Sequence, residues 1–118
     1  MTQETAKQFA NEWVNAWNNH DINLIMEHYS EKIEFHSPLI ALLKYNDTSI
    51  ITSKEDLKNY FSIGLSTYPN LKFTLHNVFV GINTLVIYYS SINNRIAAEV
   101  FKLNESNKAI KVFCNYSS

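Results

Sequence analysis

The spacing of apolar residues changes once along this chain, and that change restricts the fold more than any other feature. In residues 6–17 apolar side chains recur every three or four positions, the period of an amphipathic helix. From residue 71 onward they recur at every second position, the period of a strand with one buried face. The sequence therefore predicts one α+β domain over residues 1–118, with its helices in the first half and a sheet in the second.

Three helices are predicted in the first half. The first carries Trp13 and Trp17 on one stripe and ends at the polar residues 18–20. Asp21 then has the side chain and position of an N-cap for the second helix. Its predicted inward face consists of Ile22, Ile25, Met26 and Tyr29. The third helix starts at Ser53, because an acid three residues later makes a start like a capping box.

A short strand is predicted between the second and third helices. Residues 32–37 alternate, which separates Ser37 from its neighbour His36, and Pro38 ends the strand because it has no backbone N–H. The apolar run 39–43 fits either a helix or a strand. Residues 44–52 are predicted to form a surface loop.

Four strands are predicted in the second half. Short polar turns separate them, so sequential antiparallel pairing is the simplest topology. The predicted strands cover residues 71–75, 85–89, 95–103 and 108–116.

Charge and composition exclude several classes of function. The net charge is −1 and the ten basic residues are scattered, so neither nucleic acid nor an anionic membrane is an expected partner. Cys114 is the only cysteine, which rules out an internal disulfide and favours a reducing compartment. With no HExxH, CxxC or paired acids at ligand spacing, no metal or cofactor is expected. The polar first residues and the lack of a long apolar stretch predict a cytoplasmic protein.

Glu99 is the most informative candidate residue. It shares a strand face with the apolar residues Ala97, Phe101 and Leu103. A carboxyl group buried there would have a raised pKa and could donate a hydrogen bond or accept a proton near neutral pH. The alternative is that this face is exposed and that Glu99 pairs with Arg95 or a lysine.

Histidine and aromatic residues supply the other candidates. His36 titrates near neutral pH and could act as a base, although strict alternation turns it away from Ser37 unless a bulge or the Pro38 kink reverses it. Trp13, Trp17 and Tyr60 could line a pocket, or they could simply fill the core between helices and sheet.

Several short runs together indicate a family. They are Trp17, Asn18, Asn19, His20 and Asp21, then Tyr29 and Ser30, residues 33–37 with Pro38, and Ala98, Glu99 and Val100. This arrangement resembles the SnoaL-like branch of the NTF2-like superfamily over nearly the whole chain. The resemblance implies a cystatin-like α+β roll, in which three helices pack on a curved, mostly antiparallel sheet. It also implies a cone-shaped internal pocket and a homodimer formed through the outer face of the sheet.

The resemblance also bears on catalysis. Carried over from the ketosteroid isomerases of this superfamily, the catalytic aspartate falls on Ser37, the tyrosine on Trp13 and the oxyanion-binding acid on Glu99. A serine cannot replace the aspartate base, and an indole does not titrate. The resemblance therefore does not imply the standard steroid isomerisation.

Two hypotheses follow for the function. In the first, the pocket binds a small, largely apolar molecule and performs cofactor-free proton transfer of the isomerase, dehydratase or cyclase type, with Glu99 and His36 as acid and base. In the second, the domain is a non-catalytic carrier or a protein-binding and dimerisation module. The candidate ligand-binding residues are Trp13, Trp17, Ser37, Tyr60, Glu99 and Phe101.

Overall fold

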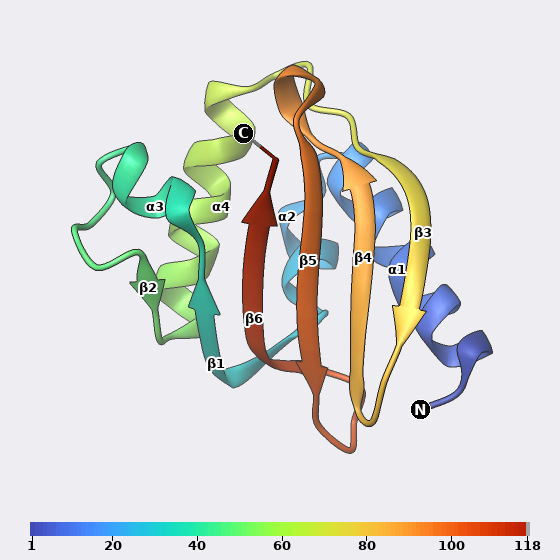
Figure 1. Ribbon diagram of the computed structural model, residues 1–118. Helices are drawn as coiled ribbons and strands as arrows, with labels where there is room; N and C mark the ends of the chain where they lie inside the picture. Colours follow the sequence, from blue (N-terminus) through green and yellow to red (C-terminus); the bar gives the residue numbers. More distant parts are fainter. Residues whose placement is uncertain (118) are drawn as a thin grey trace.

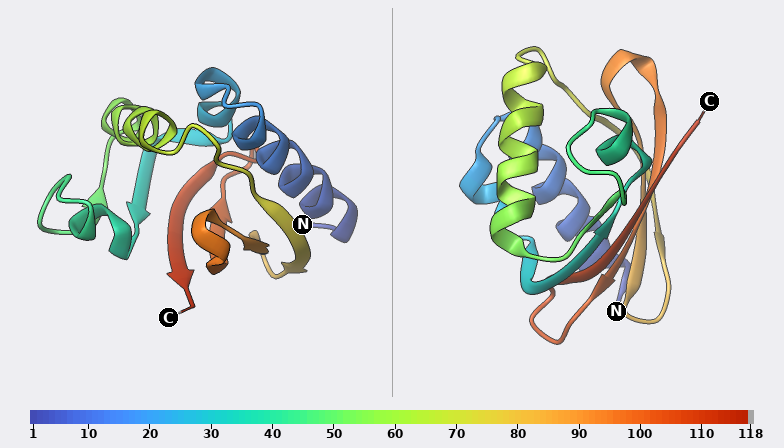
Figure 2. Two further views of the ribbon diagram at one scale, coloured as in Figure 1. Left: turned by 90° about the horizontal axis from the view of Figure 1, so that it is seen from above. Right: turned by 90° about the vertical axis from the view of Figure 1, so that its left-hand side faces the viewer.

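The computed structural model describes residues 1–117 as a curved six-stranded sheet with helices on one of its faces (Figure 1). This confirms the predicted α+β fold. Seen from above, α1 and α4 lie along the same side of the sheet (Figure 2). The elements in chain order are α1 (Gln3–Asn18), α2 (Ile22–Met26), β1 (Tyr29–His36), α3 (Pro38–Leu42), β2 (Ile50–Ile51), α4 (Lys54–Thr67), β3 (Thr74–Val80), β4 (Thr84–Ser90), the short 3₁₀ helix η1 (Ile92–Asn94), β5 (Ile96–Leu103) and β6 (Ala109–Tyr116).

The first helix forms as predicted and buries its apolar stripe against the sheet. Trp13 and Trp17 are both buried on that stripe. At the end of α1, the Asn18 amide donates to the carbonyl of Phe73 at 2.9 Å and accepts from the N–H of Phe73 at 2.7 Å. These two bonds attach the helix to the segment that leads into β3, and so fix one wall of the interior.

The second helix is shorter than predicted. Asp21 caps it, since its carboxylate accepts from the N–H of Leu24 at 3.1 Å, but the helix ends at Met26. Tyr29 was predicted on this helix and instead begins β1, where it pairs with Ala109. The carbonyl of His28 accepts the N–H of Ala109 at 2.8 Å, so pairing with β6 draws the chain into the sheet three residues before the predicted start.

The sheet has the order β2-β1-β6-β5-β4-β3. Strands β3 to β6 pair sequentially and antiparallel, as predicted, whereas β1 runs parallel to β6. Strand β3 begins at Thr74, whereas the sequence predicted a start at residue 71. Leu71 and Phe73 are nevertheless buried.

The connection between β1 and α4 contains two elements that the sequence did not define. The apolar run 39–43 lies mostly in α3, where Ser37 is the N-cap and Pro38 occupies a first-turn position that needs no N–H. The prediction that residues 44–52 form only a loop is wrong. Residues 50 and 51 form β2, which pairs antiparallel with the end of β1. Among residues 1–117, no helix combines the length and apolar character needed to cross a bilayer.

Candidate functional site

A cavity of about 360 Å³ lies between the helices and the inner face of the sheet. Trp13 and Trp17 of α1, Tyr60 of α4 and Phe73 line its apolar wall. The exposed lining residues belong to α4 and to the segment after α3, which places the opening there. These exposed residues are Leu43, Lys44, Ile63 and Thr67.

Glu99 lies on the sheet side of the cavity. Alternation along β5 turns it inward, and only 4% of the residue is exposed. The hydroxyl of Tyr89, on β4, donates to its Oε1 at 2.7 Å. The alternative of an exposed ion pair with Arg95 or a lysine is therefore wrong.

Burial changes the acidity of this carboxyl group. Desolvation raises the pKa of Glu99 to about 7, although the Tyr89 hydrogen bond and the approaching Cys114 thiol partly oppose the rise. Cys114 faces Glu99 across the β5–β6 pair. Near neutral pH the Glu99 carboxyl therefore exists in both forms, as a neutral hydrogen-bond donor and as a carboxylate.

Two hydroxyl-bearing side chains lie beside Glu99 on the cavity wall. Ser37 is 3% exposed, and its Oγ accepts from the N–H of Leu39 at 3.3 Å. Its hydroxyl also lies close to that of Tyr116, at the end of β6. Burial raises the pKa of the Tyr116 hydroxyl, so this phenol is neutral at physiological pH.

The two indole N–H groups of α1 differ in their partners. Trp13 donates to the hydroxyl oxygen of Tyr29 at 3.0 Å. The Trp17 N–H approaches the same hydroxyl but has no hydrogen-bond partner among residues 1–117, although the ring is buried. The Trp13 N–H is thus occupied by a protein acceptor.

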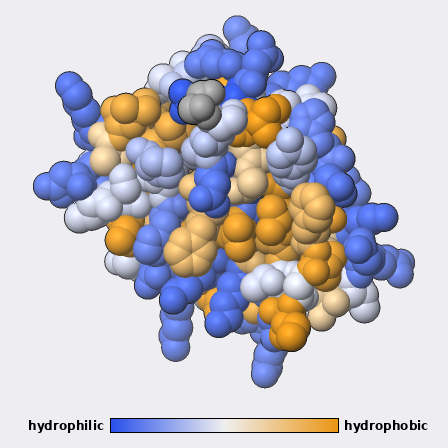
Figure 3. All heavy atoms as spheres, viewed as in Figure 1, coloured by the Kyte–Doolittle hydropathy of each residue, from blue (hydrophilic) through white to orange (hydrophobic). Residues whose placement is uncertain are grey.

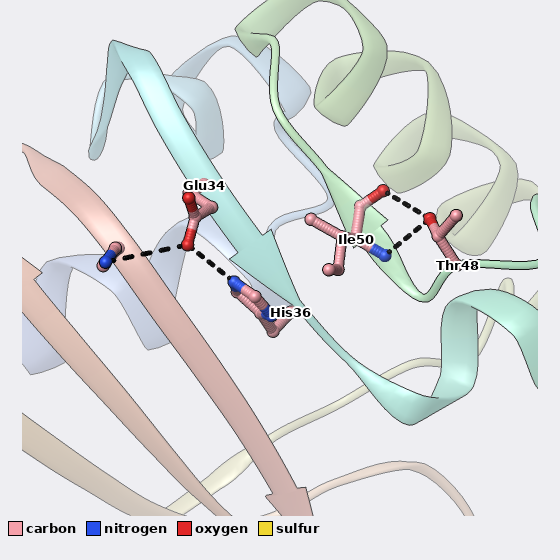
Figure 4. A network of polar contacts seen from close by, with 5 residues as sticks. Glu34, His36, Thr48 and Ile50 are labelled. Carbon is pink, nitrogen blue, oxygen red and sulfur yellow. Dashed lines mark hydrogen bonds and ion pairs between the residues drawn. The ribbon is translucent and has the colours of Figure 1, made fainter.

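His36 lies outside the cavity. It is on the outer face of the sheet, where its Nε2 pairs with Glu34 at 2.8 Å (Figure 4), and its ring stacks on Phe113 with 4.7 Å between centroids. Phe101 is also absent from the cavity wall. It is completely buried in the core, where its ring makes T-shaped contacts with Trp13 and Phe9.

The structure thus brings five of the candidate residues together and leaves two apart. Those on the cavity wall are Trp13, Trp17, Ser37, Tyr60 and Glu99. Sequence reasoning missed the tyrosines that share this space, Tyr89 and Tyr116. Strand alternation was the available signal, but their nearness to Glu99 depends on the β4–β5–β6 register, which a single sequence does not specify. Within the described chain, no group of three or more His, Cys, Asp or Glu side chains is placed to hold a metal ion.

Comparison with known proteins identifies relatives of this chain. The family model described as a SnoaL-like domain matches residues 10–100. A SnoaL-like protein of unknown function from Burkholderia thailandensis is 31% identical, with a TM-score of 0.94 over 99% of this chain and 98% of the other. No curated protein matches.

Two more distant structures share the fold alone. One is described as a putative isomerase of the SnoaL-like family from Agrobacterium tumefaciens, with 13% identity and a TM-score of 0.77 over 98% of this chain and 100% of that one. The other is described as SalBIII, an epoxide hydrolase/cyclase-like enzyme in pyran ring formation of salinomycin. It also has 13% identity and a TM-score of 0.77, over 98% and 92% of the two chains.

Proposed function

This chain belongs to the SnoaL-like domain family, and we propose that it binds one small, uncharged, largely apolar molecule in its cavity. The observation that carries this proposal is the position of Glu99, a buried carboxyl on the wall of a mostly apolar space, held by one hydrogen bond from Tyr89. In its neutral form the Glu99 carboxyl donates a hydrogen bond to a ligand oxygen, while the aromatic wall covers the apolar body.

The charges around the cavity support an uncharged ligand. Among the lining residues that the structure describes, Glu99 is the single acid and Lys44 the single base, and Lys44 is exposed at the opening. An anionic group deep inside would therefore lack an opposite partner, which is costly in an apolar environment. A cationic group would find only Glu99, which is a carboxylate for part of the time near neutral pH.

The same set of groups favours binding over acid–base catalysis by a pair of residues. Such catalysis needs a second titrating side chain within reach of the ligand. His36 lies on the other face of the sheet, and Ser37 does not titrate in the required range. We therefore rank a carrier or binding role first.

Proton transfer by Glu99 alone is the second candidate, favoured by the pKa of this carboxyl near 7. A group with that pKa can take a proton from one carbon of a ligand and return it to another, which is the step that a cofactor-free isomerase requires. The fold neighbours described as a putative isomerase and as a cyclase-like enzyme are compatible with such chemistry on this scaffold.

A pair of substitutions separates the two roles. Glu99→Gln keeps an uncharged hydrogen-bond donor but cannot transfer a proton, whereas Glu99→Met removes both abilities. In a thermal-shift screen with uncharged cyclic ketones, wild type and Glu99→Gln should be stabilised alike and Glu99→Met less. If no ketone stabilises the wild type, the binding role is contradicted.

Solvent deuterium exchange at the carbon next to the ketone, followed by NMR, tests the catalytic role. If Glu99 transfers protons, wild type should accelerate the exchange and Glu99→Gln should not. Equal exchange in both proteins leaves binding as the function.

We also propose that the outer face of the sheet joins two copies of this chain. Apolar side chains gather in the middle of this face (Figure 3). Three aromatic residues on it are partly exposed, namely Phe79, Tyr88 and Phe113, at 52%, 39% and 41%. A second copy is the occupant that the near-neutral net charge of −1 favours, because two such chains repel each other little.

A further inference from the structure

We infer that Gly64, on α4, sets the size of the molecule that the cavity accepts, because a flat fused-ring ligand lies against the bare helix backbone at this residue. This inference rests on the proposed binding of a small, uncharged, largely apolar molecule. Gly64 lines the cavity, and its missing side chain leaves room there for the body of the ligand.

Gly64 occupies the centre of the inward face of α4. Leu57, Phe61 and Tyr68 lie on either side of it along the chain, at spacings of three, four and seven residues that share one helix face. Leu57 and Phe61 are buried, and Tyr68 lines the cavity. A side chain at position 64 would therefore point into the cavity.

Neither packing nor backbone conformation requires a glycine at this position. The other glycine of the chain, Gly81, needs its small size because an added Cβ would collide with the hydroxyl of Thr84. At Gly64 an added Cβ would meet no atom of residues 1–117 within 4 Å, apart from the adjoining residues and the backbone of the helix itself. The φ angle of Gly64 is not positive, so other residues can adopt its conformation.

A glycine inside a helix nevertheless lowers stability relative to alanine, because it loses more conformational freedom on folding. Gly64 does not end the helix, since α4 continues to Thr67 and has Tyr68 as its C-cap. Close approach of another molecule to the backbone is the remaining reason for a glycine, and the cavity is where that molecule would lie.

The residues around Gly64 favour a flat ligand. Tyr60 and Phe61 precede it by about one helical turn and Tyr68 follows by one turn, so aromatic residues border the bare backbone. Aromatic rings pack well against such neighbours. The cavity of about 360 Å³ is near the lower end of the range for small-molecule sites, roughly 300–1,000 Å³, so the room of one side chain decides whether an additional ring fits.

Isothermal titration calorimetry with two ketones tests the inference. The probes are 1-indanone and 9-fluorenone, which share an uncharged cyclic ketone and differ by one fused benzene ring. On the wild type, 9-fluorenone should bind more tightly, because its additional ring buries apolar surface against Gly64. In Gly64→Leu the Kd of 9-fluorenone should rise about tenfold or more, while that of 1-indanone changes less than about threefold.

Two further variants accompany this measurement. Gly64→Ala should raise the Tm by about 2–6 °C, because alanine favours the helix and its methyl group meets no neighbouring atom. Asn59→Leu is the matched control for Gly64→Leu. It adds the same side chain to an exposed position of α4 that does not line the cavity, and it should leave both Kd values unchanged.

The inference is overturned if Gly64→Leu leaves the Kd of 9-fluorenone unchanged, or if it weakens both ketones equally, since position 64 then sets no size limit. It is equally overturned if 1-indanone binds the wild type and 9-fluorenone does not. A lower Tm in Gly64→Ala would overturn it as well, because the fold itself would then require glycine. If neither ketone binds the wild type, the proposed function fails, and the role of Gly64 with it.

Discussion

The carboxyl group of Glu99 lies among rings and aliphatic side chains, so the stability of the protein should depend on its protonation. Well below pH 4.5 the Glu99 carboxyl is neutral in both the folded and the unfolded chain. Its ionisation therefore does not affect the free energy of unfolding in that range. As pH rises from 4.5 to about 7, the unfolded chain releases this proton while the folded chain keeps it. The free energy of unfolding therefore falls, by on the order of 3 kcal/mol once both forms are ionised.

Glu99→Gln should remove this pH dependence, because glutamine does not titrate. Urea denaturation from about pH 5 to about pH 8 should show that the variant gains stability relative to the wild type as pH rises. Glu105→Gln, at an exposed turn, is the control and should follow the wild type. Parallel curves for Glu99→Gln and wild type would show that the carboxyl is not desolvated.

Tyr29 stabilises the core through its hydroxyl oxygen as well as its ring. Tyr29→Phe would leave the Trp13 indole N–H buried without its acceptor, and the free energy of unfolding should fall by about 1–3 kcal/mol. Tyr88→Phe, on the partly exposed outer face, should change it little. Urea denaturation followed by circular dichroism measures both, and an equal effect in the two variants would contradict the buried bond.

For single residues, the sequence correctly predicted the face of the strand on which a side chain lies. It was less successful in predicting the neighbours that the side chain contacts. Alternation correctly separated inward Glu99 from outward His36. It also turned Phe101 inward, but an inward ring can lie in the packed core or on the cavity wall. That choice depends on the depth of Phe101 behind Trp13, which follows from tertiary packing alone.

Among the elements, helix starts were the most predictable because their signals are local. Ser53 accepts the N–H of Asp56 at 3.1 Å at the start of α4, as its three-residue spacing from that acid indicated. The strands β1 and β2 were less predictable. Their limits depend on pairing with residues far along the chain, such as Ala109 with Tyr29.

The cap of α4 gives a prediction for this element. Ser53→Ala should lower the free energy of unfolding by about 1 kcal/mol, because the N–H of Asp56 loses its acceptor. Ser66→Ala, at an exposed position within the same helix, should leave stability unchanged or slightly higher, since alanine favours helices. Thermal and urea denaturation compare the two, and equal losses would show that the cap does not matter.

For the whole molecule, the main feature is that both faces of the curved sheet carry apolar side chains. Its inner face encloses the cavity, and its outer face presents the aromatic side chains proposed to join two copies (Figure 3). The division into a mostly helical first half and a second half of paired strands was predictable from one change of period. The volume left between them was not, because it depends on how far α4 stands from the sheet.

The proposed homodimer gives a prediction at this scale. Analytical ultracentrifugation of the wild type should give twice the chain mass of 13.7 kDa. Replacing both Tyr88 and Phe113 by lysine should give the monomer mass, because a buried charge opposes association. Ile82→Lys, at a turn residue that is 90% exposed, is the control and should remain dimeric. A monomeric wild type would refute the interface.

The positions of the two tryptophans have an optical consequence. Trp13 and Trp17 are the two tryptophans of the chain, and both lie on the wall of the same cavity. Their ring centroids are 6.2 Å apart. All of the protein's tryptophan fluorescence therefore originates at the proposed binding site. A molecule that enters should change the intensity or wavelength of that emission, so the protein can report its own occupancy without an added label.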